Sequence, residues 1–318
     1  MEFHGILVVR DEEDIISQSI SHFTEWCDFI YVYDTGSLDD TWEIVQHHAA
    51  NSDRIVPFRR EEVVFEDPLR GLVFDHFRDR AKAGDWWVRL DADEFYHIPP
   101  PEFVRRYVTS HESLIFNQTY EFRLTESEVA AWKRGKEGIE DRDRPIKERH
   151  RYYVPLKYPE PRLFQYRTEM KWTEAGSFPF NAGYPAQKRI PIRHYPHRDP
   201  QQLKKRVALR SAAANRPDLP TDFPHWKIDE WNDFVINEND DDLRYWKTGS
   251  DLPTFNWTNH MPGGIRRLIK RALYMGPVHI LDRFRSGFDE SYSPTPFPEE
   301  AQQEVRRAYE RIDEEEGI

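Results

Sequence analysis

The sequence is poor in cysteine and has no surplus of basic residues. Its 318 residues include one cysteine, Cys27, so no intramolecular disulfide can form. Lysine and arginine number 45 against 57 aspartates and glutamates, a formal net charge of −12. Binding to nucleic-acid phosphates needs a local excess of cations, so this composition argues against a nucleic-acid partner. The lack of disulfides favours a reducing compartment, and we expect the protein to be located in the cytoplasm.

Long apolar runs and several common motifs are also missing. No segment approaches the roughly 18 consecutive apolar residues of a membrane-spanning helix, and the run GILVV (5–9) is too short for a signal peptide. The absence of G-x-G-x-x-G, P-loop and G-x-S-x-G patterns weakens dinucleotide-binding, NTPase and hydrolase interpretations. With 38% hydrophobic residues, the chain can bury one sizeable core.

Strand-like and helix-like patterns alternate over residues 1–125. The predicted strands are GILVV (5–9), FIYVYD (29–34), RIVPF (54–58) and WWVRL (86–90). The predicted helices are an apolar stripe of Ile16, Ile20, Phe23 and Cys27, a segment 37–49 with Ser37 as N-cap, and a segment 74–84 closed by Gly84. This alternation predicts an α/β fold with an open, mostly parallel sheet flanked by helices.

Acidic residues follow three of these strands. Asp11, Asp34 and Asp91 each stand at a strand's carboxyl end, where open α/β sheets bind their ligands. Asp34 precedes a glycine-containing turn and a helix, a position that suits a hydrogen bond from a nucleobase N–H or a ribose hydroxyl. The alternative is an ordinary strand-to-helix turn.

The run RLDADEF (89–95) contains two aspartates separated by one alanine. In extended backbone, Asp91 and Asp93 would leave on the same face, roughly 6.5–7 Å apart, with Glu94 on the opposite face as a supporting residue. Such a pair suits a hard divalent cation with its oxygen ligands, although an isolated D-x-D is usually a solvated turn. Because like charges repel, removal of Asp93 is expected to leave stability nearly unchanged.

Four stretches together resemble family 2 glycosyltransferases with the GT-A fold: VVRDEEDIISQSISHF (8–23), IYVYDTGSLDDT (30–41), VRLDADEFY (88–96) and IPIRHYPHRDPQQLKKRV (190–207). The resemblance covers roughly residues 1–210. It implies transfer of a sugar from a nucleotide-sugar donor to an acceptor hydroxyl, with inversion, and a Mn or Mg ion. It further implies donor-binding roles for Asp11, Glu13, Asp34 and Asp91, and metal-binding roles for Asp91, Asp93 and His194.

An inverting transfer also needs a general base near the acceptor. The segment YRTEMKWTEAGSF (166–178) offers Glu174 and, as second choice, Glu169, while Trp172 and Phe178 could stack on sugar rings. We favour Glu174 because it adjoins two small residues that allow close approach of an acceptor. Each glutamate could equally be an ordinary surface residue, and His194 could be purely structural.

These features predict a catalytic domain over 1–210, with a nucleotide-sugar-binding half (1–125) and an acceptor half (126–210), followed by a helical C-terminal extension (211–318). The acceptor would be a glycan or a lipid-linked molecule. A basic amphipathic pattern at 263–284 predicts either contact with a membrane surface or packing of its apolar stripe on the catalytic domain. The second functional hypothesis is a non-catalytic protein of the same fold that binds a sugar or nucleotide.

Overall fold

The computed structural model describes residues 1–174, 176–214, 216, 230–254, 258–259, 263–284, 286–288 and 292–316, without the side chains of Arg267, Met275 and His279. Its strands are β1 (Phe3–Val9), β2 (Phe29–Asp34), β3 (Ile55–Arg60), β4 (Trp86–Leu90), β5 (Glu94–Tyr96), β6 (Leu114–Phe122), β7 (Tyr152–Pro155), β8 (Pro161–Gln165), β9 (Ile190–His194) and β10 (Arg244–Tyr245).

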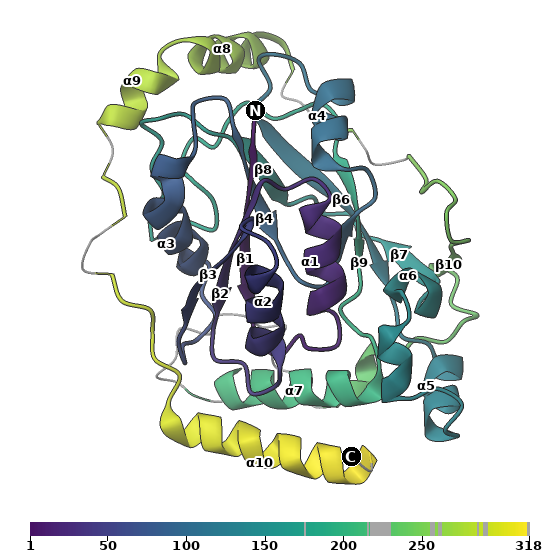
Figure 1. Ribbon diagram of the computed structural model, residues 1–318. Helices are drawn as coiled ribbons and strands as arrows, with labels where there is room; N and C mark the ends of the chain where they lie inside the picture. Colours follow the sequence, from purple (N-terminus) through teal and green to yellow (C-terminus); the bar gives the residue numbers. More distant parts are fainter. Residues whose placement is uncertain are drawn as a thin grey trace.

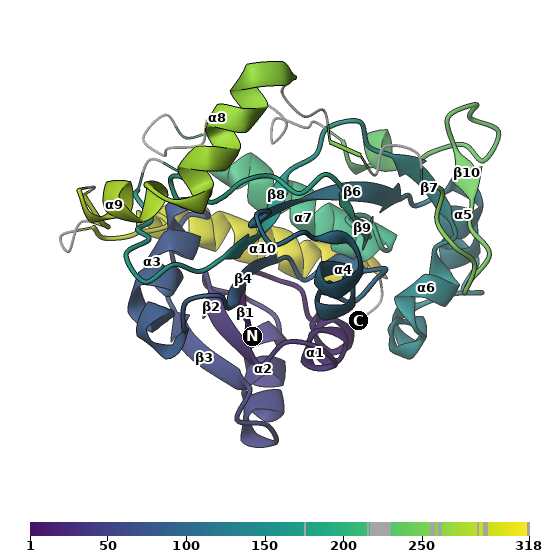
Figure 2. The ribbon, with the colours of Figure 1, turned by 90° about the horizontal axis from the view of Figure 1, so that it is seen from above.

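The helices surround this sheet and continue beyond it (Figures 1 and 2). They are α1 (Ile16–Thr24), α2 (Thr41–Ala50), α3 (Pro68–Phe77), α4 (Pro100–Tyr107), α5 (Glu126–Lys133), α6 (Ile146–Arg149), α7 (Pro200–Ala214), α8 (Gly264–Met275), α9 (Val278–Arg283) and α10 (Glu299–Glu316). Short 3-10 turns occupy Arg78–Arg80, Ile139–Asp143 and Trp231–Phe234. The predicted class, an open α/β sheet flanked by helices with a helical C-terminal extension, is therefore confirmed.

The sheet combines a parallel half with an antiparallel half. Its order is β10-β7-β6-β8-β4-β1-β2-β3, with β9 paired to β5 and β6 beside this path. Strands β3, β2, β1 and β4 pair in parallel, whereas β8 joins β4 and β6 in antiparallel register. Since β1 lies between β2 and β4, the carboxyl ends that carry the predicted acidic residues are neighbours.

Both faces of the parallel half are buried because the side chains of β1 alternate. Leu7 and Val9 belong to a cluster that includes Ile16 and Ile20 of α1. On the other face, Ile6 and Val8 pack in a cluster with Leu69, Val73 and Phe74 of α3. Figure 2 shows α1 and α2 on one side of β1 and β2, and α3 on the other.

Several element boundaries differ from the predicted ones. The third helix begins at Pro68, a residue preorganised for the first helical turn, and ends at Phe77 rather than at Gly84. Helix α2 begins at Thr41, so Ser37 is not its N-cap. The Ser37 hydroxyl instead accepts a hydrogen bond from the backbone N–H of Asp11.

The C-terminal extension is joined to the body at several places. Helix α7 continues past residue 210, α10 packs along α7, and β10 adds a strand to β7. Helix α8 does not bury its apolar stripe on the rest of the described chain: Ile265 and Leu268 are exposed. Among the residues that the structure describes, no helix combines the length and apolar character needed to cross a membrane.

Candidate functional site

A cavity of about 600 Å³ lies beyond the carboxyl ends of β1 and β4. Its acidic lining residues are Glu12, Asp67, Asp91, Asp93, Glu94 and Glu160. Its basic lining residues are Arg10, Arg70, Arg89, Arg162, His194, Arg206 and Arg210. The predicted D-x-D pair thus lines a cavity at the expected edge of the sheet, among many arginines that the sequence analysis did not consider.

The D-x-D segment forms a turn rather than extended backbone. Strand β4 ends at Leu90, and the N–H of Glu94 donates to the carbonyl of Asp91 at 3.0 Å before β5 begins. The prediction that Asp91 and Asp93 leave one face of a strand was therefore wrong. The turn directs the two carboxylates to different partners.

Asp91 is surrounded by guanidinium groups. Its Oδ1 accepts from Arg70 Nη2 at 2.5 Å and its Oδ2 from Arg162 Nη1 at 2.6 Å. Arg89 Nε lies 3.3 Å from the second oxygen. Burial alone would raise the pKa of Asp91, but Arg89, Arg70 and Arg162 outweigh it and hold the pKa below its usual range.

Glu94 shares one of these arginines. Arg162 stands beside the end of β4 because β8 pairs antiparallel with β4, and its Nη2 donates to Glu94 Oε1 at 2.6 Å. The other oxygen, Oε2, is buried and has no hydrogen-bond partner in the described part of the chain. Burial raises the pKa of Glu94 to about 7 despite Arg162. Glu94 thus lines the same cavity as Asp91, contrary to the expectation of a supporting role on the opposite face.

Asp93 and His194 are brought together by the pairing of β5 with β9. His194 Nε2 lies 3.3 Å from Asp93 Oδ2, and its Nδ1 lies 3.5 Å from Glu121 Oε2. Arg206 Nη1 of α7 donates to the same Asp93 oxygen at 3.3 Å. Burial opposes protonation of His194, but Asp93 and Glu121 raise its pKa to about 10. Both ring nitrogens of His194 face carboxylates, an arrangement that favours the protonated imidazolium.

The carboxylates at the D-x-D turn fit a divalent cation in their chemistry, because Mn²⁺ and Mg²⁺ prefer oxygen ligands. The same oxygens of Asp91 and Asp93 are bound to guanidiniums here. A cation at Asp93 would exchange with Arg206, and ligation by His194 would require loss of its proton. The metal-binding roles of Asp91, Asp93 and His194 remain predictions.

Asp34 is fully buried at the end of β2. Its Oδ1 accepts from the backbone N–H groups of Gly36 and Ser37, each at 2.7 Å. Its Oδ2 is buried without a hydrogen-bond partner among the described residues, and burial raises the pKa of the carboxyl group. One oxygen thus holds the predicted turn, whereas the other is enclosed, because Asp34 lines neither the 600 Å³ cavity nor the smaller one beside Asp11.

Asp11 and Glu13 line a smaller cavity of about 50 Å³. Asp11 has a positive φ of 54°, and its oxygens accept from the Leu38 N–H at 2.6 Å and from the Tyr309 hydroxyl of α10 at 2.8 Å. Glu13 Oε2 accepts from the Asp40 N–H at 3.3 Å. Glu12 and Arg206 line both cavities, so the two spaces adjoin.

The predicted acceptor-side residues lie elsewhere. Trp172 is 1% exposed and packs on Phe74 and Phe164, with its Nε1 donating to the Gly176 carbonyl at 2.8 Å, so the prediction of sugar stacking is corrected to a core role. Glu169 lines a separate cavity of about 480 Å³. The lining of the 600 Å³ cavity includes neither Glu169 nor Glu174.

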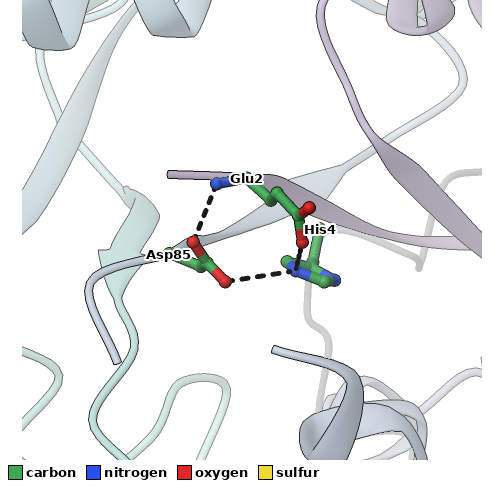
Figure 3. A group of neighbouring side chains, drawn as sticks. All are labelled: Glu2, His4 and Asp85. Atoms are coloured by element: carbon green, nitrogen blue, oxygen red, sulfur yellow. Dashed lines mark hydrogen bonds and ion pairs between the residues drawn. The ribbon is translucent and has the colours of Figure 1, made fainter. Parts of the chain in front are cut away.

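Glu2, His4 and Asp85, whose side chains are of types that can bind a metal ion, come together near the amino-terminal ends of β1 and β4 (Figure 3). Ligand atoms of Glu2, His4 and Asp85 lie within 4.8 Å of one another, and His4 Nε2 is 3.9 Å from each carboxylate. Asp85 also accepts from the backbone N–H groups of Glu2 at 2.8 Å and Lys82 at 2.7 Å. These hydrogen bonds connect the start of β1 to the start of β4. A structural role therefore accounts for the position of Asp85 in this group.

Sequence reasoning missed the arginines that organise the 600 Å³ cavity. One local signal existed, because Arg89 interrupts the apolar run WWVRL. Arg70, Arg162 and Arg206 lie on α3, β8 and α7, and only the tertiary fold brings them to the D-x-D turn.

No family model and no curated protein sequence matches the chain. Among solved structures it is similar to S. aureus TarS in complex with UDP-GlcNAc, at 14% identity over 39% of this chain and 34% of that chain, with a TM-score of 0.29. Another is the mannosyltransferase PcManGT from Pyrobaculum calidifontis in complex with GDP-Man and Mn²⁺ (13% identity, 69% of this chain, 66% of that chain, TM-score 0.36). A third is glucosyl-3-phosphoglycerate synthase from Mycobacterium tuberculosis in complex with Mn²⁺, UDP and phosphoglyceric acid (22% identity, 42% of this chain, 48% of that chain, TM-score 0.25). The match spans about a third of the TarS chain, and likenesses this distant do not decide a function.

Proposed function

We propose that this protein is a glycosyltransferase with a GT-A-like sheet that moves a sugar from a nucleotide-sugar donor to an acceptor hydroxyl, with inversion. The observation that carries the proposal is the 600 Å³ cavity at the carboxyl edge of β1 and β4, where the D-x-D carboxylates face a set of arginines. The four motifs that resemble family 2 glycosyltransferases support the same reaction class.

In this proposal the donor spans both cavities. Asp11 and Glu13 line the smaller cavity and would bind the nucleoside there. Asp34 is fully buried and lines neither cavity, so its Oδ2 would have to become accessible before it could accept a hydrogen bond from the nucleoside. The diphosphate lies toward the arginines of the larger cavity, since guanidiniums match phosphate oxygens in geometry and charge. Arg206 and Arg210 of α7 are suited to this role because they line that cavity from one helix.

The reaction breaks the bond between the anomeric carbon and the diphosphate, and the leaving diphosphate keeps the electron pair. Positive groups fixed near the leaving oxygens stabilise this charge in the transition state. A divalent cation held by Asp91 and Asp93, with His194 as a further ligand, would supply Lewis-acid stabilisation of the same charge.

The acceptor hydroxyl forms the new bond and gives its proton to a carboxylate. Glu174 and Glu169 were selected from the sequence, but neither lines the cavity. Glu94 does, and its Oε2 has no hydrogen-bond partner among the described residues. We therefore add Glu94 to Glu174 and Glu169 as a candidate general base.

Calorimetric titration with UDP, GDP, UDP-GlcNAc and GDP-mannose, each with and without Mn²⁺, tests donor binding. Release of free sugar or its transfer to an added acceptor tests turnover. Specific binding together with turnover supports the proposal. Binding without turnover supports the alternative, a non-catalytic sugar- or nucleotide-binding protein, and absence of binding to any nucleotide would refute both.

A further inference from the structure

Helices α8 and α9 form an anchored arm with an apolar outer surface. Seven large apolar side chains on them are exposed: Ile265, Leu268, Ile269, Leu273, Ile280, Leu281 and Phe284. The exposed fraction reaches 72% for Ile265 and 84% for Phe284. A concentration of exposed apolar side chains of this kind usually marks an interaction site.

The arm is attached to the body through other side chains. Val278 is buried, and the ring of Tyr274 packs edge-on against that of Tyr184 at 6.4 Å between centroids. Asp282 is 2% exposed and receives hydrogen bonds from Arg167 Nε at 2.7 Å and Nη2 at 3.2 Å. Since these contacts fix which side faces the body, the apolar side is turned outward by the fold.

The helical repeat of α8 gives the same orientation. At 3.6 residues per turn, Ile265, Leu268, Ile269 and Leu273 share one side of the helix, and Tyr274 lies on the other. Arg266 and Arg271 stand at the two borders of the apolar side, and both are exposed. The stripe is therefore flanked by cations along its length.

The charge of the arm contrasts with that of the whole chain. Residues 263–284 contain five lysines and arginines and one acid, Asp282, which is paired with Arg167, whereas the protein carries a net charge of −12. Apolar side chains bordered by cations match a lipid surface with anionic headgroups, where each lysine or arginine contributes about 1 kcal/mol. A purely apolar partner would gain nothing from these cations.

We propose that α8 and α9 dock this protein on an anionic lipid surface, with the seven apolar side chains entering the headgroup region. Figure 1 shows both helices at the end of the molecule where the parallel strands begin, and α7 at the end where they finish. The 600 Å³ cavity therefore faces away from the docked surface and remains open to a donor and an acceptor.

Vesicle co-sedimentation of the full chain tests this inference without donor or acceptor, so its outcome is independent of the proposed glycosyltransferase activity. We expect binding to vesicles of phosphatidylcholine mixed with phosphatidylglycerol, little binding to phosphatidylcholine alone, and weakening by salt. The double variant Leu268→Asp with Ile269→Asp should lower partitioning into vesicles roughly a hundredfold, since it removes two apolar side chains that would be buried in the lipid. Arg266→Glu with Arg271→Glu should lower it at least about fivefold per position.

Tyr158→Asp is the matched control, because it places an acid at an aromatic residue that is 86% exposed outside the arm. It should bind like the wild type, and all variants should keep the wild-type melting temperature. Absence of binding to anionic vesicles at low salt, or equal binding by the arm variants and the control, overturns the proposal. A dimer in sedimentation velocity that Leu268→Asp dissociates would assign the surface to a second copy of the chain and also overturn it.

Discussion

Arg198 donates to both carboxylate oxygens of Asp14, from Nε at 2.6 Å and from Nη2 at 2.8 Å. The two residues are 184 positions apart and both are buried. Nη2 also donates to Glu12 at 2.6 Å. This contact joins the segment after β1 to the segment between β9 and α7, and so holds together two walls of the adjoining cavities.

We predict that Arg198→Ala lowers the free energy of unfolding by about 3–5 kcal/mol, because it leaves the buried carboxylates of Asp14 and Glu12 without their cation. Urea unfolding measures this change. The control is Arg306→Ala, which removes an exposed pair with Glu62 at 3.3 Å and should cost less than about 1 kcal/mol. Similar losses of unfolding free energy in the two variants would show that the buried Arg198–Asp14 pair contributes no more to stability than the exposed pair.

Asp93 should contribute to both stability and donor binding. Its removal was expected to leave stability nearly unchanged because like charges repel, but His194 and Arg206 surround this carboxylate with positive charge and its pKa is lowered despite burial. Asp93→Asn should therefore cost about 1–3 kcal/mol of unfolding free energy through its charged hydrogen bonds. It should also abolish metal-dependent affinity for the donor.

Calorimetric titration of donor with and without Mn²⁺, on the wild type, Asp93→Asn and Asp75→Asn, checks this prediction. Asp75 is a matched control because it pairs with Arg78 at 3.6 Å and lies outside the cavity lining. Unchanged metal-dependent affinity in Asp93→Asn would remove Asp93 from the proposed donor site.

The sequence predicted what local patterns encode. Strands β2 and β4 have the predicted bounds because each is a largely apolar run, interrupted in β4 only by Arg89, that ends at or next to an aspartate. The placement of Asp11, Asp34 and Asp91 at one edge followed from parallel pairing. The turn at Ala92 was not predictable in this way, because it depends on the pairing of β5 with β9, a strand nearly a hundred residues later.

Side-chain partners across the fold were the main omission. Arg162 reaches Asp91 and Glu94 because β8 returns antiparallel beside β4, an arrangement that no local pattern specifies. The prediction that Trp172 stacks on sugar rings was wrong for a related reason. Whether an aromatic side chain lines a cavity or fills a core depends on neighbours such as Phe74.

The general base can be identified by comparing glutamine variants. We predict that Glu94→Gln lowers kcat by roughly 10²–10⁴ and leaves donor affinity nearly unchanged, because the amide keeps a similar shape but cannot accept the acceptor's proton. Glu174→Gln and Glu169→Gln should retain most of their turnover if Glu94 is the base. Steady-state kinetics with the correct acceptor decides among the three, and normal turnover in Glu94→Gln would return the role to Glu174.

The stability of the fold should depend on pH through His22. This residue of α1 accepts a hydrogen bond at Nε2 from the backbone N–H of Tyr96 at 3.0 Å, which requires the neutral imidazole. Burial lowers the pKa of His22 to about 4, and Arg193 and Lys147 lower it further. Glu25 lies 3.9 Å from Nδ1 but is exposed.

Because the unfolded chain binds this proton near pH 6.5 and the folded chain only near pH 4, the His22 contribution is complete above pH 6.5 and is lost as the pH falls toward 4. The loss should reach roughly 3 kcal/mol. Gln at this position can accept from Tyr96 without titrating, so His22→Gln should show a flatter dependence of unfolding free energy between these pH values. His47→Gln, at an exposed position of α2, should follow the wild-type curve. Urea unfolding at a series of pH values measures all three proteins, and parallel curves for His22→Gln and the wild type would exclude His22 as the source.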